Sequence, residues 1–182
     1  MLRAVGAIDH PVAVLLVVTE RTLVASAVGL VESPTALLSS VDELALLMEE
    51  GFRLMQVEDG ESPYFRLTTR TIFQIDRPDD SWKAGALAGG YWLREPAPGA
   101  EAALVYSGAI APEALGAWEA LKDDVPGLGL LAITSPDLLH RGWSERRSGR
   151  WTGKSAAPSH VETLLAPLSK DAGLVTLIDG SP

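Results

Sequence analysis

The sequence contains no cysteine, and this absence removes several classes of site. Disulfide bonds, thiolate nucleophiles and cysteine-ligated zinc or iron–sulfur centres are all excluded. Histidine is also scarce, because His10, His140 and His160 are the three in the chain and none has a second histidine at the spacing of a zinc-binding helix. We therefore predict no metal site in this chain.

Positive charge and long apolar runs are also in short supply. The chain has 15 Lys and Arg residues against 24 Asp and Glu residues, for a formal net charge of −9, so we predict no nucleic-acid partner. The longest apolar run covers residues 12–18, whereas a membrane span needs about 20 residues. Asp9 and Glu20 flank this run, which favours a buried strand over a signal peptide. We expect a cytoplasmic protein with no membrane contact.

The composition is that of a chain with a sizeable core. Of the 182 residues, 47% are hydrophobic and 21% are charged. In the second half, expected strands at 102–106, 129–134 and 173–178 alternate with expected helices at 112–122 and 159–168. Such alternation predicts the α/β fold class, with parallel sheets that have a mixed edge and flanking helices.

Two segments carry the capping-box pattern Ser-x-x-Glu, at residues 40–43 and 159–162. In each, we expect the serine and glutamate side chains to satisfy each other's free backbone N–H group. The first box opens a helix predicted to run to about residue 57. Its apolar residues fall on one stripe: Leu44, Leu47, Met48, Gly51, Phe52 and Met55.

The remaining segments divide the chain. We predict strands at 11–18 and 63–69, and a loop at 19–34 because its polarity has no clear period. Residues 79–100 are rich in Pro and Gly, which predicts a linker. The expected organisation is therefore a first domain at 1–78, the linker at 79–100 and a second domain at 101–182.

Candidate ligand-binding residues lie where two predicted strands end. Ser107 and Gly108 stand at the carboxyl end of one strand, Thr134 and Ser135 stand at the carboxyl end of another, and a helix comes next in both cases. Ligands collect at the carboxyl ends of strands in open α/β sheets, and helix N-termini favour anions. Because a strand–turn–helix is common without any ligand, these four residues are weak candidates, and no catalytic residue is predicted.

Two further groups of residues are better explained by structural roles than by catalysis or ligand binding. Ser135, Asp137 and His140 could supply a catalytic triad, but no G-x-S-x-G motif is present and their spacing is typical of a helix cap. A basic segment mixes arginine and lysine with tryptophan, which could suit a phosphate or a single-stranded nucleic acid. In an acidic chain, a surface loop or subunit contact is favoured for its members: Arg141, Trp143, Arg146, Arg147, Arg150, Trp151 and Lys154.

Several phrases resemble, in order, one family of enzymes. They are YFRLTTRTIFQ (64–74), ALAGGY (86–91), VYSGAI (105–110) and ITSPDLLHRGW (133–143). Together they resemble the homodimeric pyruvate dehydrogenase first component and its transketolase-like relatives, from about residue 19 onward. The resemblance implies the end of a pyrimidine-binding domain at 1–78 and an incomplete transketolase carboxyl-terminal-like domain at 101–182.

The family uses thiamine diphosphate and Mg²⁺ to decarboxylate a 2-oxo acid and to acylate a lipoyl carrier. The resemblance implies that the diphosphate-binding Gly-Asp-Gly…Asn motif and the activating glutamate lie in regions upstream of this chain's match. Residues 23–29 stand where the family carries its active-site histidine, and here they contain none. No catalytic or cofactor-binding residue is therefore carried over, and neither thiamine diphosphate nor Mg²⁺ is expected to bind this chain alone.

These observations leave three hypotheses. In the first, the chain is part of a thiamine-diphosphate-dependent 2-oxo-acid dehydrogenase of the pyruvate type, a fragment or a stand-alone remnant that supplies scaffold and dimer interface. Its partners would be a second copy, and an upstream domain or other subunits of the dehydrogenase complex. The second is a non-enzymatic transketolase-like interaction module. The third is an unrelated small α/β protein that binds a ligand at Ser107 and Thr134.

Overall fold

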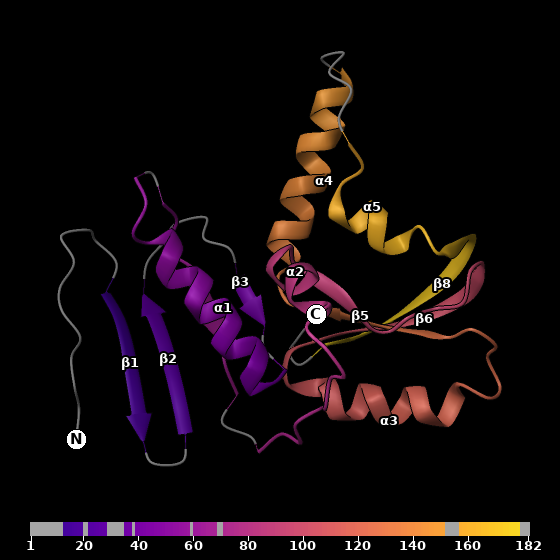
Figure 1. The fold of residues 1–182 in the computed structure, drawn as a ribbon, viewed down its shortest axis with the longest axis horizontal. Helices are drawn as coiled ribbons and strands as arrows, with labels where there is room; N and C mark the ends of the chain where they lie inside the picture. The colour runs from indigo at the N-terminus through magenta and orange to yellow at the C-terminus, as the bar shows by residue number, and fades with distance from the viewer. Residues whose placement is uncertain are drawn as a thin grey trace.

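The computed structural model describes residues 13–19, 22–28, 35–37, 39–58, 60–68, 71–151 and 157–178 (Figure 1). A four-stranded sheet with the order β5-β7-β6-β8 forms its centre. Strands β6 (Ala100–Ser107), β7 (Gly129–Ile133) and β8 (Leu168–Ile178) are parallel. Strand β5 (Gly90–Arg94) runs antiparallel to β7 at one edge, which confirms the α/β class with a mixed edge.

Helices cover both faces of this sheet. Helix α3 (Ala111–Leu121), preceded by the short 3₁₀ helix η1 (Gly108–Ile110), connects β6 to β7. Helices α4 (Pro136–Trp151) and α5 (His160–Leu165) connect β7 to β8. Figure 1 shows α3 on one side of the sheet and α4 and α5 on the other.

The strands assign side chains to the two faces by alternation. On β7, Leu130 and Ala132 belong to the core beneath α3, whereas Leu131 and Ile133 face the core of α4 and α5. Successive side chains of a strand point to opposite faces, so a continuously apolar strand can serve two layers at once. This explains why the second half was predictable from its apolar runs.

The first half is built around α1 (Val41–Leu54). Its residue Leu47 packs against Phe65 and Leu67, so these two share a face. Strand β4 (Tyr64–Arg66) is shorter than the predicted 63–69 and pairs in parallel with β3 (Thr35–Leu37). At Gly51 an added Cβ would lie 2.8 Å from Pro63 Cγ, so only glycine lets this segment approach the helix so closely.

Two expectations for the first half are wrong. Residues 22–28, predicted as loop, form β2 (Thr22–Val28), which pairs antiparallel with β1 (Ala13–Thr19). Small Ala and Ser residues in this strand hide its period, and the pairing with β1 determines its structure. Helix α1 ends at Leu54, and Phe52 from the predicted apolar stripe is 50% exposed.

Much of the predicted linker is regular structure. Within residues 79–100, α2 (Trp82–Leu87) and β5 contribute Trp82, Ala86 and Tyr91 to the core. An added Cβ on Gly85 would lie 2.8 Å from Tyr91 Cβ, so the glycine content here serves close packing. The linker prediction is therefore wrong for residues 82–94, while the division into domains at 1–78 and 101–182 stays a prediction.

Two observations concern the remaining surface. The basic segment was predicted as a surface loop or a subunit contact. It is helical from Arg141 to Trp151, within α4, because the cap at Ser135 and Pro136 starts a helix that continues through it, and a subunit contact there stays a prediction. Across the described part of the chain, no helix has the length and apolar character that crossing a membrane requires.

Candidate functional site

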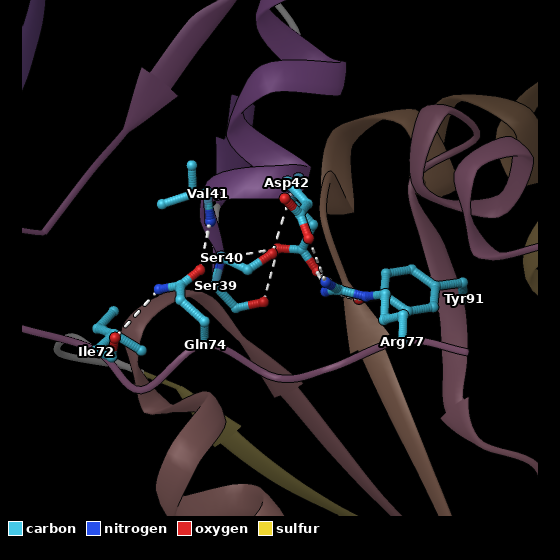
Figure 2. Close-up of polar contacts among 9 residues, drawn as sticks. Ser39, Ser40, Val41, Asp42, Ile72, Gln74, Arg77 and Tyr91 are labelled. Atoms are coloured by element: carbon cyan, nitrogen blue, oxygen red, sulfur yellow. Dashed lines mark hydrogen bonds and ion pairs between the residues drawn. The ribbon is translucent and has the colours of Figure 1, made fainter. Parts of the chain in front are cut away.

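A buried polar cluster joins the first half of the chain to the central sheet. Its centre is Glu43 on the first turn of α1, which is 0% exposed. Around it lie Ser39, Arg77 from the segment before α2, and Tyr91 of β5 (Figure 2). The Arg77 side chain is itself largely buried, so the cluster contains an ion pair removed from water.

Both oxygens of the Glu43 carboxylate are fully used. Oε2 accepts hydrogen bonds from the backbone N of Ser39 at 2.8 Å and from its Oγ at 2.6 Å. Oε1 accepts from Arg77 Nη2 at 2.8 Å and from the Tyr91 hydroxyl. A buried carboxylate is costly unless it is paired and hydrogen-bonded, and here it is both.

The capping box predicted for residues 40–43 forms only in half. Ser40 Oγ accepts from the backbone N of Glu43 at 3.3 Å, as expected. The Glu43 side chain, however, bonds to Ser39 and not to the backbone N of Ser40. The reciprocal half of the prediction is wrong because Arg77 and Tyr91 hold the carboxylate on the sheet side of the helix.

Arg77 lies between an acid and two aromatic rings. Its guanidinium carbon is 4.3 Å from the ring centroid of Trp82 and 5.5 Å from that of Tyr91. Its Nη2 donates to the Tyr91 hydroxyl at 2.6 Å as well as to Glu43. Burial acts to lower the pKa of Arg77, but the hydrogen bond to Tyr91 and the negative charge of Glu43 raise it above its ordinary value. Arg77 therefore stays charged.

Two tyrosines stand in one row of the sheet. Tyr91 on β5 pairs with Ala132 on β7, which pairs in turn with Tyr106 on β6, so the small alanine separates the two rings. Burial, and then the negative charge of Glu43, raise the pKa of both phenols well above the ordinary value. Both hydroxyls therefore remain neutral at physiological pH.

The hydroxyl of Tyr106 differs from that of Tyr91. The Tyr106 residue is 1% exposed, and its oxygen has no hydrogen-bond partner among the described residues. Tyr91, in contrast, accepts from Arg77 and donates to Glu43. Chemically, the cluster can hold α1 on the sheet, but it contains no activated nucleophile and no base with a free lone pair directed at a substrate.

Two of the residues predicted at strand ends, Ser107 and Thr134, do lie close together, at the carboxyl ends of the neighbouring strands β6 and β7. Ser107 stands in register with Ile133, immediately before Thr134. Ser107 Oγ donates to the carbonyl of Ile133 at 2.9 Å, and Thr134 Oγ1 donates to the carbonyl of Ala86 at 2.6 Å. Both hydroxyl protons are thus engaged with the backbone.

The other two candidates have local structural positions. Ser135 Oγ accepts from the backbone N of Leu138 at 3.4 Å, at the start of α4. Gly108 opens η1 with φ of 76°, a conformation that favours glycine. A ligand role for Ser107, Gly108, Thr134 and Ser135 stays a prediction. The triad arrangement does not form, because His140 Nε2 contacts Ser144 Oγ at 3.3 Å and not Ser135.

The basic segment on α4 is dispersed among separate contacts. Arg141 makes a two-pronged pair with Glu61, at 2.7 and 3.1 Å, which ties the first half of the chain to α4. Arg146 Nε lies 2.5 Å from Glu162 Oε2. Arg147 stacks over Trp143, 5.3 Å from the ring centroid. Lys154 and the side chains of residues 150 and 151 lie outside the described residues.

Sequence reasoning missed Arg77 and Tyr91, and no local signal could have found them. Arg77 is 34 residues from Glu43, and Tyr91 is 48 residues from it. Tyr91 falls in the segment whose Pro and Gly content predicted a linker, and Arg77 lies just before that segment.

The residues described do not fit a diphosphate held by Mg²⁺. Such a site needs carboxylate and amide oxygens directed at the metal. Within the described ranges, no group of three or more His, Asp or Glu side chains is placed to hold a metal ion. The buried carboxylate of Glu43 is already surrounded by donors.

No family model matches the sequence, and no curated protein matches it either. Among solved structures, the R525L mutant of the transketolase from Pichia stipitis is similar with a TM-score of 0.55 and 14% identity, over 80% of this chain and 18% of that one. A split-gene transketolase, described as an inactive beta4 tetramer, is similar with a TM-score of 0.50 and 15% identity, over 82% of this chain and 49% of that one.

These similarities define the fold as transketolase-like, which agrees with the fold part of the sequence resemblance. The match to this chain covers less than half the length of either transketolase. At 14% and 15% identity the likeness concerns the fold, and it does not support the narrower assignment to the pyruvate dehydrogenase first component.

Proposed function

We propose that the chain is a scaffold and dimer-interface part of a thiamine-diphosphate-dependent enzyme of transketolase-like fold, acting on a 2-oxo acid of the pyruvate type. The fold supports the general class, and the ordered phrases at 64–74, 86–91, 105–110 and 133–143 support the narrower assignment. In such an enzyme the bound cofactor supplies the stabilised carbanion. The residues of this chain supply structure.

The proposal is supported by the hydrogen bonds of the buried cluster. Its polar side-chain atoms have partners except Nη1 of Arg77, and the hydroxyl of the neighbouring Tyr106 also has none among the described residues. Glu43 fixes α1 to the sheet through Arg77 and Tyr91, over 34 and 48 residues of sequence. Arg141 and Glu61 add a second tie, over 80 residues. These contacts make the first and second halves one framework. They leave no carboxylate in the cluster available as a general base.

The test measures cofactor binding with and without a partner that carries the diphosphate motif. Isothermal titration of the chain alone with thiamine diphosphate and Mg²⁺ is expected to show no micromolar binding. The same titration of its complex with a co-expressed polypeptide containing Gly-Asp-Gly…Asn, encoded beside it, is expected to show binding, together with pyruvate-dependent reduction of an artificial electron acceptor.

Arg77→Met provides the structural control in the complex. If the cluster is a scaffold, this variant lowers the thermal stability of the complex, while the turnover per bound cofactor is unchanged. Micromolar binding by the chain alone would overturn the scaffold proposal. A complex that binds cofactor but turns over another substrate would overturn the pyruvate assignment only.

A non-enzymatic interaction module with the same fold is the second candidate. The outer edge of β8, which pairs with no other strand of the described residues, favours it, because such an edge can bind another strand without any chemistry. The absence of a neighbouring gene for a Gly-Asp-Gly…Asn polypeptide, combined with a stable complex with a protein that has no cofactor, would favour this candidate over the first.

A further inference from the structure

The far half of α4 differs from the other helices in how little it buries. No described residue of α4 beyond Leu139 is buried, and Figure 1 shows the far end of this helix standing clear of the central sheet. An added Cβ at Gly142 would meet no atom within 4 Å, so no other described element packs against the helix there. Gly142 and Gly149 also lower its helix propensity. A polar helix of this kind gains stability when a partner covers it.

One side of this half carries three exposed side chains, His140, Trp143 and Arg147, which we call the α4 ladder. Their spacing of three and four residues places them one above another on the helix. The ring centroids of His140 and Trp143 are 6.1 Å apart, and the guanidinium carbon of Arg147 is 5.3 Å from the Trp143 ring centroid. Trp143 is still 39% exposed, so the ladder presents an indole ring and a guanidinium to solvent together.

Arg147 differs in its partners from two other arginines of the same helix. Arg141 is paired with Glu61, and Arg146 is paired with Glu162. Arg147 has no ion-pair partner among the described residues, and its contact is with the tryptophan ring. A guanidinium stacked on an aromatic ring keeps its in-plane N–H donors free, and these can bind a carboxylate through two hydrogen bonds. The ladder therefore offers an anion site whose anion must come from outside the described chain.

The acidic residues of α4 do not neutralise Arg147. Glu145 is two positions from both Trp143 and Arg147, so it lies on the opposite side of the helix. Asp137 neighbours His140, but it is ten residues before Arg147, or about 15 Å along the axis. The helix contains four arginines against these two acids, whereas the rest of the chain contains 11 Lys and Arg residues against 22 Asp and Glu residues. The ladder is thus a basic surface on an acidic chain.

We propose that the α4 ladder binds an acidic segment of another polypeptide, with a carboxylate on Arg147 and an apolar side chain on the exposed ring of Trp143. Tryptophan and arginine are the residues that most often dominate the binding energy of protein interfaces. A short acidic segment can stay within the projecting helix, whereas a nucleic acid would extend over the acidic remainder of the chain and be repelled. The inference goes beyond the proposed function and does not depend on it.

Fluorescence anisotropy with a labelled synthetic peptide, in which pairs of glutamate alternate with leucine, tests the proposal on the full chain. This peptide is expected to bind at least tenfold more tightly than a matched peptide with glutamine in place of glutamate. Its binding is expected to weaken as salt is added, because exposed charges are screened. Arg147→Ala and Trp143→Ala are each expected to raise the dissociation constant of the acidic peptide about tenfold.

Arg94→Ala is the matched control. Arg94 also stacks on a tryptophan, 5.5 Å from the Trp118 ring centroid, but it does so beside α3, which covers the other face of the sheet. The variant removes the same charge from the same kind of contact and is expected to leave the dissociation constant unchanged. Backbone hydrogen exchange at 143–149 in the wild-type chain, expected to slow when the acidic peptide binds, covers the case in which Trp143→Ala fails to fold.

Several outcomes would overturn the proposal. Equal or absent binding of the two peptides would mean that the ladder does not select acidic segments. An equal loss of affinity in Arg94→Ala would mean that the peptide responds to net charge alone. Tighter binding of an oligothymidylate, lost in Arg147→Ala, would assign the ladder to single-stranded nucleic acid. Self-association of the wild-type chain in light scattering, removed by Trp143→Ala, would show that a second copy covers the ladder.

Discussion

The same sequence pattern, Ser-x-x-Glu, has two different outcomes in this protein. At α5, Glu162 Oε2 accepts from the backbone N and the Oγ of Ser159, both at 2.8 Å, and the Ser159 side chain accepts from the backbone N of Glu162, so a complete capping box forms. At α1, Glu43 turns away from the corresponding backbone N–H and binds Ser39, Arg77 and Tyr91.

The difference teaches what a local motif can and cannot specify. In both places a serine marks the first turn of a helix, because backbone N–H groups there need acceptors whatever the surroundings. The glutamate's own partners depend on what the fold brings beside it. Glu162 is partly exposed, with Arg146 beside it, whereas Glu43 is buried against the sheet.

The largest expected effect on stability comes from replacing Glu43, the buried glutamate of the two. Glu43→Gln removes the counter-charge of Arg77 and is expected to lower the free energy of unfolding by about 3–5 kcal/mol, because it leaves a buried charge unpaired. Urea denaturation measures it. The double variant Glu43→Leu with Arg77→Met is expected to recover much of the loss, since it removes both charges. A loss below about 1 kcal/mol for Glu43→Gln would contradict the burial of the pair.

The next largest effect is expected from replacing Tyr91, the residue of the sheet that bonds to Glu43 and Arg77. Tyr91→Phe removes a donor to Glu43 and an acceptor for Arg77, and is expected to cost about 1.5–3 kcal/mol, the usual range for a hydrogen bond to a charged group. The measurement is the same urea denaturation. An unchanged midpoint would mean that Ser39 and Arg77 satisfy Glu43 without the tyrosine.

Tyr106→Phe is the matched control in the same row of the sheet. Its hydroxyl is buried without a described partner, so removing it is expected to keep the free energy of unfolding or to raise it by about 1 kcal/mol. A destabilisation as large as that of Tyr91→Phe would show that the Tyr106 hydroxyl binds a group in solution, such as a buried water.

The smallest effect concerns the exposed glutamate. Hydrogen bonds from the Ser159 backbone and side chain lower the pKa of Glu162 from 4.5 to about 2. The carboxylate therefore stabilises the fold fully above pH 4.5, and this contribution is lost as the pH falls through about 2. Glu162→Gln is expected to lower the melting temperature slightly at neutral pH, with the difference from wild type shrinking between pH 4.5 and 2. A pH-independent difference would show that the capping box acts without its charge.

The ease of prediction also divides the chain. Strands β6 and β7 and helices α3 and α5 were predictable because the strands are apolar on both faces and the two helices carry a cap or an early proline. Helix α4 was not predicted, because its basic segment resembles a surface loop. Strand β5 was missed because it is short, begins within a glycine pair and lies antiparallel at an edge. Strand β2 was missed because small residues obscure its alternation.

The candidate sites follow the same division. The sequence by itself determined that Ser107 and Thr134 would lie at strand ends, since local apolar runs locate the ends of strands. Only the tertiary structure decided how their hydroxyls are used, because the carbonyls of Ile133 and Ala86 arrive from other segments. It likewise decided that Glu43 meets Arg77 and Tyr91. Hydrogen bonds and ion pairs act over a few ångströms in space, and the sequence places these partners 34 and 48 residues apart.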